Sequence, residues 1–142
     1  MNIDGPPVEE IRDGETIIAI IVRASFDAPG VHFFSQQHFS QQLGLIHYES
    51  GHVIPPHVHN RLAREVMYTQ ETLFIRTGSC RVDLYGDDKR PLTSRVLSAG
   101  DVILLSTGGH GFEMLDDCSM IEVKQGPYSG DADKSRFEAA RP

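Results

Sequence analysis

The chain has 142 residues, the size of one domain with a hydrophobic core of its own. Its formal net charge is −7 at pH 7 and it contains no run of basic residues, which excludes the usual signature of a nucleic-acid or anionic-membrane partner. The longest apolar run, "IIAIIV" at 17–22, is far too short to span a bilayer.

The beginning of the chain, "MNIDGPPVEEIRDGE", is polar and acidic rather than basic and then apolar. We therefore expect no signal peptide and a cytoplasmic location. Residues 1–14 are predicted to be an N-terminal extension, 15–128 a single β-domain, and 129–142 a polar tail. Within that tail, the stretch "DKSRFEAA" is compatible with a short helix.

The central region predicts an all-β fold. Glycine and proline recur at short intervals, and the segments between them are rich in β-branched and aromatic residues, a pattern typical of a sandwich or barrel. The predicted strands are 15–23, 31–36, 42–49, 52–59, 66–77, 79–85, 93–98, 101–106, 110–115 and 119–125.

The clearest alternation is "SCRVDLY" at 79–85, which places Cys80, Val82 and Leu84 on one face of a strand. Composition predicts turns at 77–79, 85–91 and 116–117. We expect Cys80 and Cys118 to be small buried apolar side chains, because they are far apart in sequence and a reducing compartment disfavours a disulfide.

The stretch "IPPHVHN" at 54–60 holds two histidines at positions i and i+2. On an extended chain these side chains, His57 and His59, point to the same face and can share a metal ion. Taken alone, such a pair is more often a structural or surface feature than a pair of metal ligands.

Two more ligand-type residues fall on apolar strand faces. Alternation puts Glu71 beside Leu73 and Ile75, where a carboxylate is costly to bury unless it is paired. In the same way, His110 shares a face with Phe112. Each residue has an ordinary alternative reading, as an edge-strand charge or as a satisfied buried histidine.

These residues occur in the order of two known motifs. The first half of the first motif reads Gly51, five residues, His57, one residue, His59. The second half of the same motif reads Glu71, six residues, Gly78. The second motif runs from Gly100 through five residues to the stretch 106–110, which ends in a histidine. In both respects the chain resembles the cupin superfamily over about residues 42–125.

The resemblance implies a cupin-type double-stranded β-helix, a jelly-roll barrel, with one divalent transition metal. The metal ligands that it implies are His57, His59, Glu71 and His110. Three imidazoles and a carboxylate suit Fe, Mn, Ni, Co or Zn. The resemblance also implies a homodimer built by packing or exchanging N-terminal strands.

Three departures from the motif leave alternatives open. Eleven residues separate His59 from Glu71, so Glu65 competes as the carboxylate ligand, although the spacing from Glu71 to Gly78 favours Glu71. Ser106 stands where the motif has proline. His110 comes one residue early, a shift that the glycines before it can absorb.

For function, the resemblance implies a metal-dependent enzyme, of dioxygenase or isomerase/epimerase type, acting on a small polar metabolite such as an anionic or sugar-like one. The alternative is a non-catalytic cupin module that binds a ligand or senses it together with a partner protein. Residues that qualify as substrate contacts, or equally as solvated surface groups, are Arg64, Arg76, Lys124, Gln125 and Tyr128.

Overall fold

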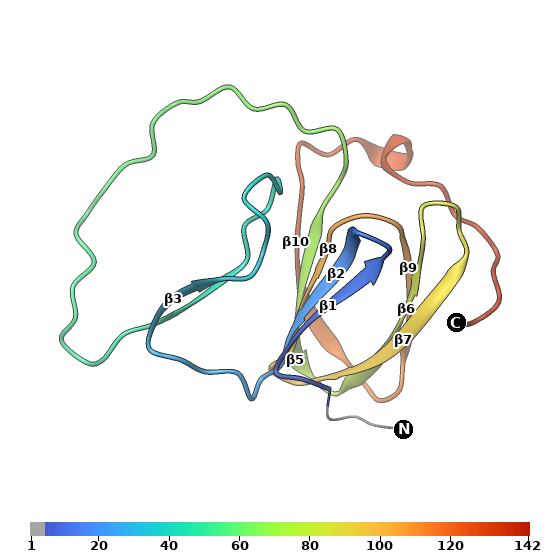
Figure 1. Cartoon of the computed structure of the whole chain (residues 1–142), viewed down its shortest axis with the longest axis horizontal. Helices are drawn as coiled ribbons and strands as arrows, with labels where there is room; N and C mark the ends of the chain where they lie inside the picture. The colour runs from blue at the N-terminus through green and yellow to red at the C-terminus, as the bar shows by residue number, and fades with distance from the viewer. Residues whose placement is uncertain (1–4) are drawn as a thin grey trace.

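The computed structural model describes residues 5–142, and over this range the fold is all-β (Figure 1). Every strand pairing is antiparallel. The helical content of the described range is one 3₁₀ turn, η1 (Gly130–Asp133). No helix in this range has the length and apolar character needed to cross a membrane.

The larger sheet has five strands in the order β1-β2-β8-β5-β10. Their bounds are Val8–Asp13 for β1, Thr16–Val22 for β2, Val102–Leu105 for β8, Glu71–Thr77 for β5 and Ser119–Lys124 for β10. The smaller sheet has the order β7-β6-β9, with β7 at Pro91–Ser98, β6 at Ser79–Tyr85 and β9 at Gly109–Met114.

The inner faces of these two sheets pack against each other and form the main core; we call this unit the sandwich. Alternation selects its members: Leu73 and Ile75 from β5 face Val82 and Leu84 from β6. The buried side chains are Ile11, Ile18, Ala19, Ile21, Leu73, Ile75, Cys80, Val82, Leu84, Leu97, Ile103 and Leu105.

One side of the sandwich, where β1 and β7 end the two sheets, is held by ion pairs; we call it the closed side. Arg95 of β7 contacts Glu9 of β1 at 2.6 Å. The buried Arg23 guanidinium donates to Asp101 Oδ2 at 3.0 Å and to the Val96 carbonyl at 2.7 Å. Buried charges are tolerated when they are paired and hydrogen-bonded in this way.

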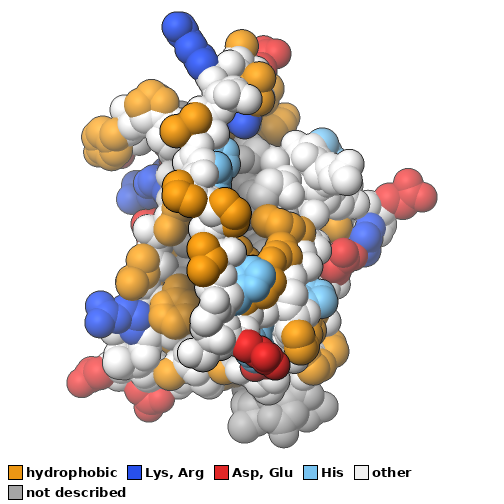
Figure 2. All heavy atoms as spheres, turned by 90° about the vertical axis from the view of Figure 1, so that its left-hand side faces the viewer, with side chains coloured by type: hydrophobic (Ala, Val, Ile, Leu, Met, Phe, Trp, Pro, Cys, Tyr) orange, Lys and Arg blue, Asp and Glu red, His pale blue; other side chains and the backbone are white. Residues whose placement is uncertain are grey.

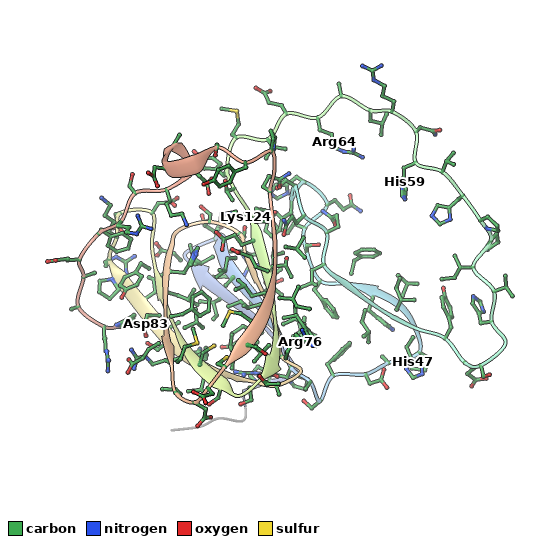
Figure 3. The ribbon with its side chains drawn as sticks, turned by 180° about the vertical axis from the view of Figure 1, so that it is seen from behind. His47, His59, Arg64, Arg76, Asp83 and Lys124 are labelled. Carbon is green, nitrogen blue, oxygen red and sulfur yellow. The ribbon has the colours of Figure 1, made fainter. Side chains whose placement is uncertain are left out.

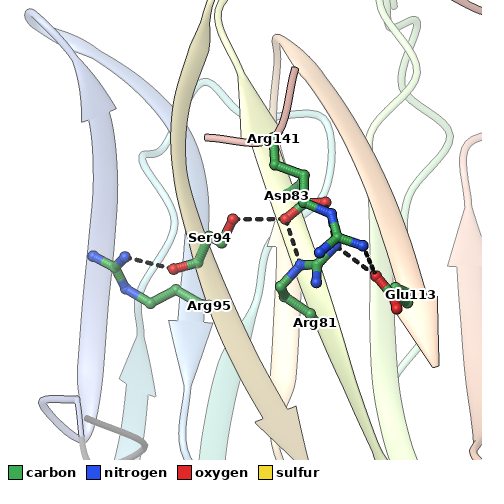
Figure 4. A network of polar contacts seen from close by, with 6 residues as sticks. All are labelled: Arg81, Asp83, Ser94, Arg95, Glu113 and Arg141. Carbon is green, nitrogen blue, oxygen red and sulfur yellow. Dashed lines mark hydrogen bonds and ion pairs between the residues drawn. The ribbon is translucent and has the colours of Figure 1, made fainter. Parts of the chain in front are cut away.

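A polar network also covers the outer face of the smaller sheet (Figure 4). Arg81 donates to both oxygens of Asp83, and the Ser94 hydroxyl donates to Asp83 Oδ1 at 2.6 Å. Arg81 and Arg141 both contact Glu113. The C-terminal tail is thereby attached to this face.

The opposite side of the sandwich is different. The strands β9 and β10 end their sheets, and each pairs with one neighbour only within residues 5–142. They are consecutive in the chain and joined by the short connection 115–118, so their unpaired edges lie along the same side. We call this the open side.

A hairpin of β3 (Gly30–Phe33) and β4 (Gly44–His47) extends from the sandwich. The segment within and before it packs Phe26, Phe34, Phe39 and Leu43 on the outer face of the larger sheet, over Ile20 among others. After β4 the chain runs through a long excursion, residues 48–69, which arcs far from the sandwich before returning at β5 (Figure 1). We call residues 48–69 the arm.

The strand predictions are confirmed except at 52–59, where the structure has no strand. The residues are able to form one, but a strand needs a paired edge, and Pro55 and Pro56 lack the N–H donors that pairing uses. The predicted 31–36, 42–49 and 66–77 are shorter, at Gly30–Phe33, Gly44–His47 and Glu71–Thr77.

Two differences concern the ends of the domain. Strand β1 lies inside the segment predicted as an extension, because its polar sequence is that of an edge strand with one buried residue, Ile11. In the tail, helical geometry is confined to η1, ahead of the predicted stretch. Phe137 instead packs edge-on against Tyr85, with ring centroids 5.2 Å apart.

Candidate functional site

The open side of the sandwich brings together two of the predicted ligands. Glu71 begins β5 and faces inward with Leu73, while His110 of β9 faces inward as the cross-strand neighbour of Leu84. The His110 Nε2 atom lies 3.6 Å from Glu71 Oε2. The two side chains are 30% and 15% exposed, so the pair is sheltered yet reachable from solvent.

Strand β10 adds two charged side chains to the same place. Its register sets Glu122 beside Leu73 and Lys124 beside Glu71, so both point to the inner face. The contact with His110 lowers the pKa of Glu71, and the charge of Lys124 lowers it further, whereas burial raises it. Burial, together with the neighbouring Glu71, raises the pKa of Glu122.

These shifts have one physical meaning. Two carboxylates compete for positive charge, and the one nearer to His110 ionises first. A local cation would lower the energy of both carboxylates at once. The open side therefore holds two interacting carboxylates, Glu71 and Glu122, beside one imidazole and the Lys124 ammonium group.

The predicted histidine pair lies on the arm, away from Glu71 and His110. Figure 3 shows His59 and Arg64 on the outlying arm and Lys124 on the sandwich. The rings of His57 and His59 have centroids 5.3 Å apart. The Nδ1 of His57 lies 3.0 Å from the carbonyl oxygen of Pro55.

That contact indicates which ring nitrogen of His57 carries the proton. A carbonyl oxygen only accepts hydrogen bonds, so Nδ1 must carry the proton and donate it. In the neutral ring the lone pair then belongs to Nε2. A ligand histidine is commonly oriented in this way, with its other nitrogen donating to a backbone carbonyl.

The structure thus assembles two half-sites rather than one cluster of four. Across residues 5–142 no group of three or more His, Cys, Asp or Glu side chains has a geometry that could hold a metal. Glu71 lies beside His110, whereas Glu65 lies on the exposed arm. The geometry therefore keeps Glu71 ahead of Glu65 as the carboxylate partner of His110.

The half-site on the sandwich fits a divalent transition metal. Ligands about 2.0–2.2 Å from such an ion lie roughly 3.0–3.5 Å from each other, close to the separation of His110 and Glu71. One imidazole and one carboxylate are too few to hold an ion firmly. The residues that would complete the set are His57 and His59.

The weaker substrate candidates separate into two groups. Lys124 points to the open side, and Gln125 follows it with a buried Oε1 that has no hydrogen-bond partner in the described chain. Arg76 lies on the outer face of β5, Arg64 on the arm, and Tyr128 is 91% exposed. The structure therefore leaves only Lys124 and Gln125 near the Glu71–His110 pair.

Sequence reasoning missed Glu122. Its signal was the alternation in "SMIEVK" at 119–124, where Met120 packs against the core and Glu122 follows on the same face. A carboxylate at i+2 from a core-facing methionine is the same pattern that singled out Glu71.

A cavity of about 410 Å³ opens elsewhere, at the base of the arm. Phe39, Tyr68 and the buried Gln70 are among the residues that line it, and neither Glu71 nor His110 does. The Gln70 amide donates to the Ser106 hydroxyl, and its Oε1 accepts from the Gln41 backbone N–H. These contacts tie the segment between β3 and β4 to the larger sheet through Gln70 and carry no metal-ligand chemistry.

Comparison with protein family models, with curated proteins and with solved structures returned no match for this chain.

Proposed function

We propose that this protein is a metal-dependent enzyme of the cupin type, acting on a small polar metabolite at the open side of its sandwich. The observation that carries the proposal is the Glu71–His110 pair, 3.6 Å apart, on the inner face of the antiparallel sandwich beside its apolar core. Its ligand set is Glu71 and His110 together with His57 and His59 of the His-x-His motif.

The chemistry of the donors supports this proposal. Imidazole and carboxylate side chains together suit Fe, Mn, Ni, Co and Zn, and four protein ligands leave open coordination positions. A metal bound there would supply Lewis acidity, or the electrons for dioxygen chemistry. The open side gives a small molecule direct access to it.

The chain's own residues give the substrate its expected character. Lys124, beside Glu71, offers an ammonium group to an anionic or hydroxylated ligand. Glu122, whose pKa is raised by burial and by Glu71, is suited to exchanging a proton with that ligand near the metal.

The test is elemental analysis of protein purified without an affinity tag, followed by reconstitution with excess Co²⁺. We expect about one equivalent of a first-row transition metal per chain in the wild type. Glu71→Gln should lose the metal, and Glu65→Gln, its matched control on the arm, should keep it. Wild-type protein that retains no metal after reconstitution would refute the proposal, and loss in Glu65→Gln alone would move the ligand to the arm.

A further inference from the structure

The arm is exposed and makes few contacts with the rest of its own chain. All 21 residues from 48 to 68 are exposed. Beyond the bond from His52 N to Glu49 O, no backbone hydrogen bond holds residues 50–68 in the described chain. Extended backbone with unpaired N–H and C=O groups can add as a strand to the exposed edge of a sheet.

The side chains of the arm are those of an interface. Large apolar residues lie in the solvent along it, and Val58, between the two histidines, is 86% exposed. Figure 2 shows hydrophobic side chains and histidines gathered on this face. The exposed apolar residues of the arm are Tyr48, Val53, Ile54, Val58, Leu62, Val66, Met67 and Tyr68. A patch of this extent marks a contact surface.

The open side of the sandwich has unpaired strand edges and exposed apolar side chains, and the arm has the backbone and side chains to cover them. Strands β9 and β10 each present an unpaired edge there. Met114 and Val123, on these two strands, are exposed. The inner polar residues there are Glu71, Glu122, His110 and Lys124. Residues 50–64 of the arm carry three histidines and two arginines, with Glu49 and Glu65 on either side of this stretch. The two surfaces are complementary in hydrogen bonding and hydropathy.

Both ends of the arm are anchored by contacts within its own chain. Strand β4 is already paired with β3, and His47 at its end contacts Asp27 at 2.6 Å. The following turn is fixed by stacking of Tyr48 on His52, with centroids 3.7 Å apart. At the other end, Thr69 donates to Asp133. The arm leaves and returns at fixed points and projects outward between them (Figure 1).

We infer that two copies of this chain exchange arms, so that residues 52–59 of one copy lie along the open side of the other. In this arrangement His57 and His59 of one copy complete the partner's Glu71–His110 pair. The inference deepens the proposed function and rests on it. Each metal site is then built from two chains, and the exchange is reciprocal, which closes the assembly as a two-fold dimer.

The geometry of an exchanged arm is feasible. Nine residues separate His47 from His57, so ten steps of extended chain give a reach of about 33–36 Å, enough to cross to a neighbouring molecule. An added strand at the edge of β9 pairs on one side only. One of the adjacent prolines, Pro55 or Pro56, then faces solvent at no cost, and the other removes one hydrogen bond from the ladder. Alternation then turns both imidazoles inward and Val58 outward.

A mixed dimer tests the exchange. The arm-defective chain carries His57→Ala and His59→Ala, and the sandwich-defective chain carries Glu71→Gln and His110→Ala. The two are co-expressed with different non-histidine tags, and the heterodimer is isolated by sequential capture. Exchange gives it one intact site, so it should bind about half as much Co²⁺ per chain as the wild type, while both mutant homodimers bind none.

The outcomes separate the two proposals. If the wild type binds Co²⁺ and the heterodimer binds none, each site is built within one chain; the exchange is then overturned and the proposed function stands. If the wild type binds no Co²⁺, the proposed function fails, and with it the shared site. Exchange of the arms is then decided by size alone. Replacing 50–67 with a short Gly-Ser linker should convert a dimer to a monomer in light scattering, and a variant that remains dimeric overturns the exchange.

Discussion

The sandwich and the arm contrast in how their polar groups are satisfied. In the sandwich, Asp101 accepts hydrogen bonds from Arg23, from Ala24 N and from Ser98 N, all at 2.9–3.0 Å. In the arm, sixteen residues in succession, 53–68, have no backbone partner in the described chain. Both regions carry charged and apolar side chains, so composition alone does not separate them.

The difference shows which polar residues have structural roles and which are available for chemistry. On the closed side Arg23 is paired with Asp101 and Arg95 with Glu9, and substitution there should cost folding free energy. On the open side and the arm, the same residue types have loose partners or none. Substitution there should cost assembly and binding instead.

The largest expected loss of folding free energy comes from removing an ion pair on the closed side. Asp101→Ala leaves the Arg23 charge buried without its carboxylate, and we expect a loss of about 3–5 kcal/mol in the free energy of unfolding. Urea denaturation at pH 7 measures it. The matched substitution on the arm, Glu65→Ala, should change the same quantity by less than about 0.5 kcal/mol. Similar losses in the two variants would mean that the arm is as firmly integrated as the sandwich.

Two glycines with the same backbone conformation sharpen the contrast. Gly78, between β5 and β6, has φ +74°, and Gly51, at the start of the arm, has φ +89°. A Cβ at Gly78 would lie 2.1 Å from the Asp117 carbonyl oxygen, whereas a Cβ at Gly51 would meet no atom within 4 Å. Gly78→Ala should lose about 1–2 kcal/mol from backbone strain and more because of the clash, whereas the exposed arm can relax around Gly51→Ala, which should change the free energy of unfolding by less than about 0.5 kcal/mol.

Urea midpoints of Gly78→Ala and Gly51→Ala measure this difference directly. We expect Gly78→Ala to unfold at the lower urea concentration, with unchanged dependence of the free energy on urea. Equal midpoints would show that the Gly78 turn relaxes as freely as the arm does.

A smaller and pH-dependent effect comes from the network on the outer face of the smaller sheet. The hydrogen bond from Arg81 lowers the pKa of Asp83 below that of an ordinary aspartate, against the effect of burial and with help from Ser94. A carboxyl group whose folded-state pKa is depressed stabilises the fold above its unfolded pKa, and this contribution is lost as pH falls through the folded pKa.

Asp83→Asn should therefore lower stability by about 1–2 kcal/mol at pH 7, the usual value for hydrogen bonds to a charged group. The difference from the wild type should shrink below pH 3.8. Urea titrations at pH 7, 5 and 3 measure the trend. A difference that stays constant with pH would mean that the Asp83 charge does not contribute.

Much of the fold follows from local pattern. The alternation of Cys80, Val82 and Leu84 predicted both the bounds of β6 and its buried face. The same reasoning failed at 52–59, because alternation and β-branching show that a strand is possible and do not supply its partner. Strand β1 was missed for the converse reason: its sequence is polar with one buried residue, Ile11, and its pairing with β2 makes it a strand.

The candidate site divides in the same way. Period-two alternation placed Glu71 and His110 on inner faces, and the structure brings them together. It also applied to Glu122, which was passed over because the motif has no carboxylate there. The position of His57 and His59 is not encoded by any local signal, because it depends on what the arm contacts.

The smallest change in folding free energy is expected from substitutions in the arm itself, and proteolysis reports on the arm without altering the sandwich. Trypsin cleaves after arginine in exposed, unpaired backbone, and Arg61 and Arg64 lie in such backbone, whereas Arg81 and Arg95 are paired in strands. In dilute solution we expect the first cuts at Arg61 and Arg64. The double variant Arg61→Gln, Arg64→Gln should resist cutting while its free energy of unfolding changes by less than about 0.5 kcal/mol.

The dependence of the cleavage rate on protein concentration shows whether the arm is paired with a second molecule or exposed to solvent. If the arm pairs with a second molecule, its backbone becomes hydrogen-bonded in the dimer, and the cleavage rate at Arg61 and Arg64 must fall as the protein is concentrated. Cuts in the sandwich depend on its own unfolding and should be far less sensitive to concentration. A rate at the arm that is the same at all concentrations would mean that the arm stays in solvent, and His57 and His59 would then have no route to the Glu71–His110 pair of another chain.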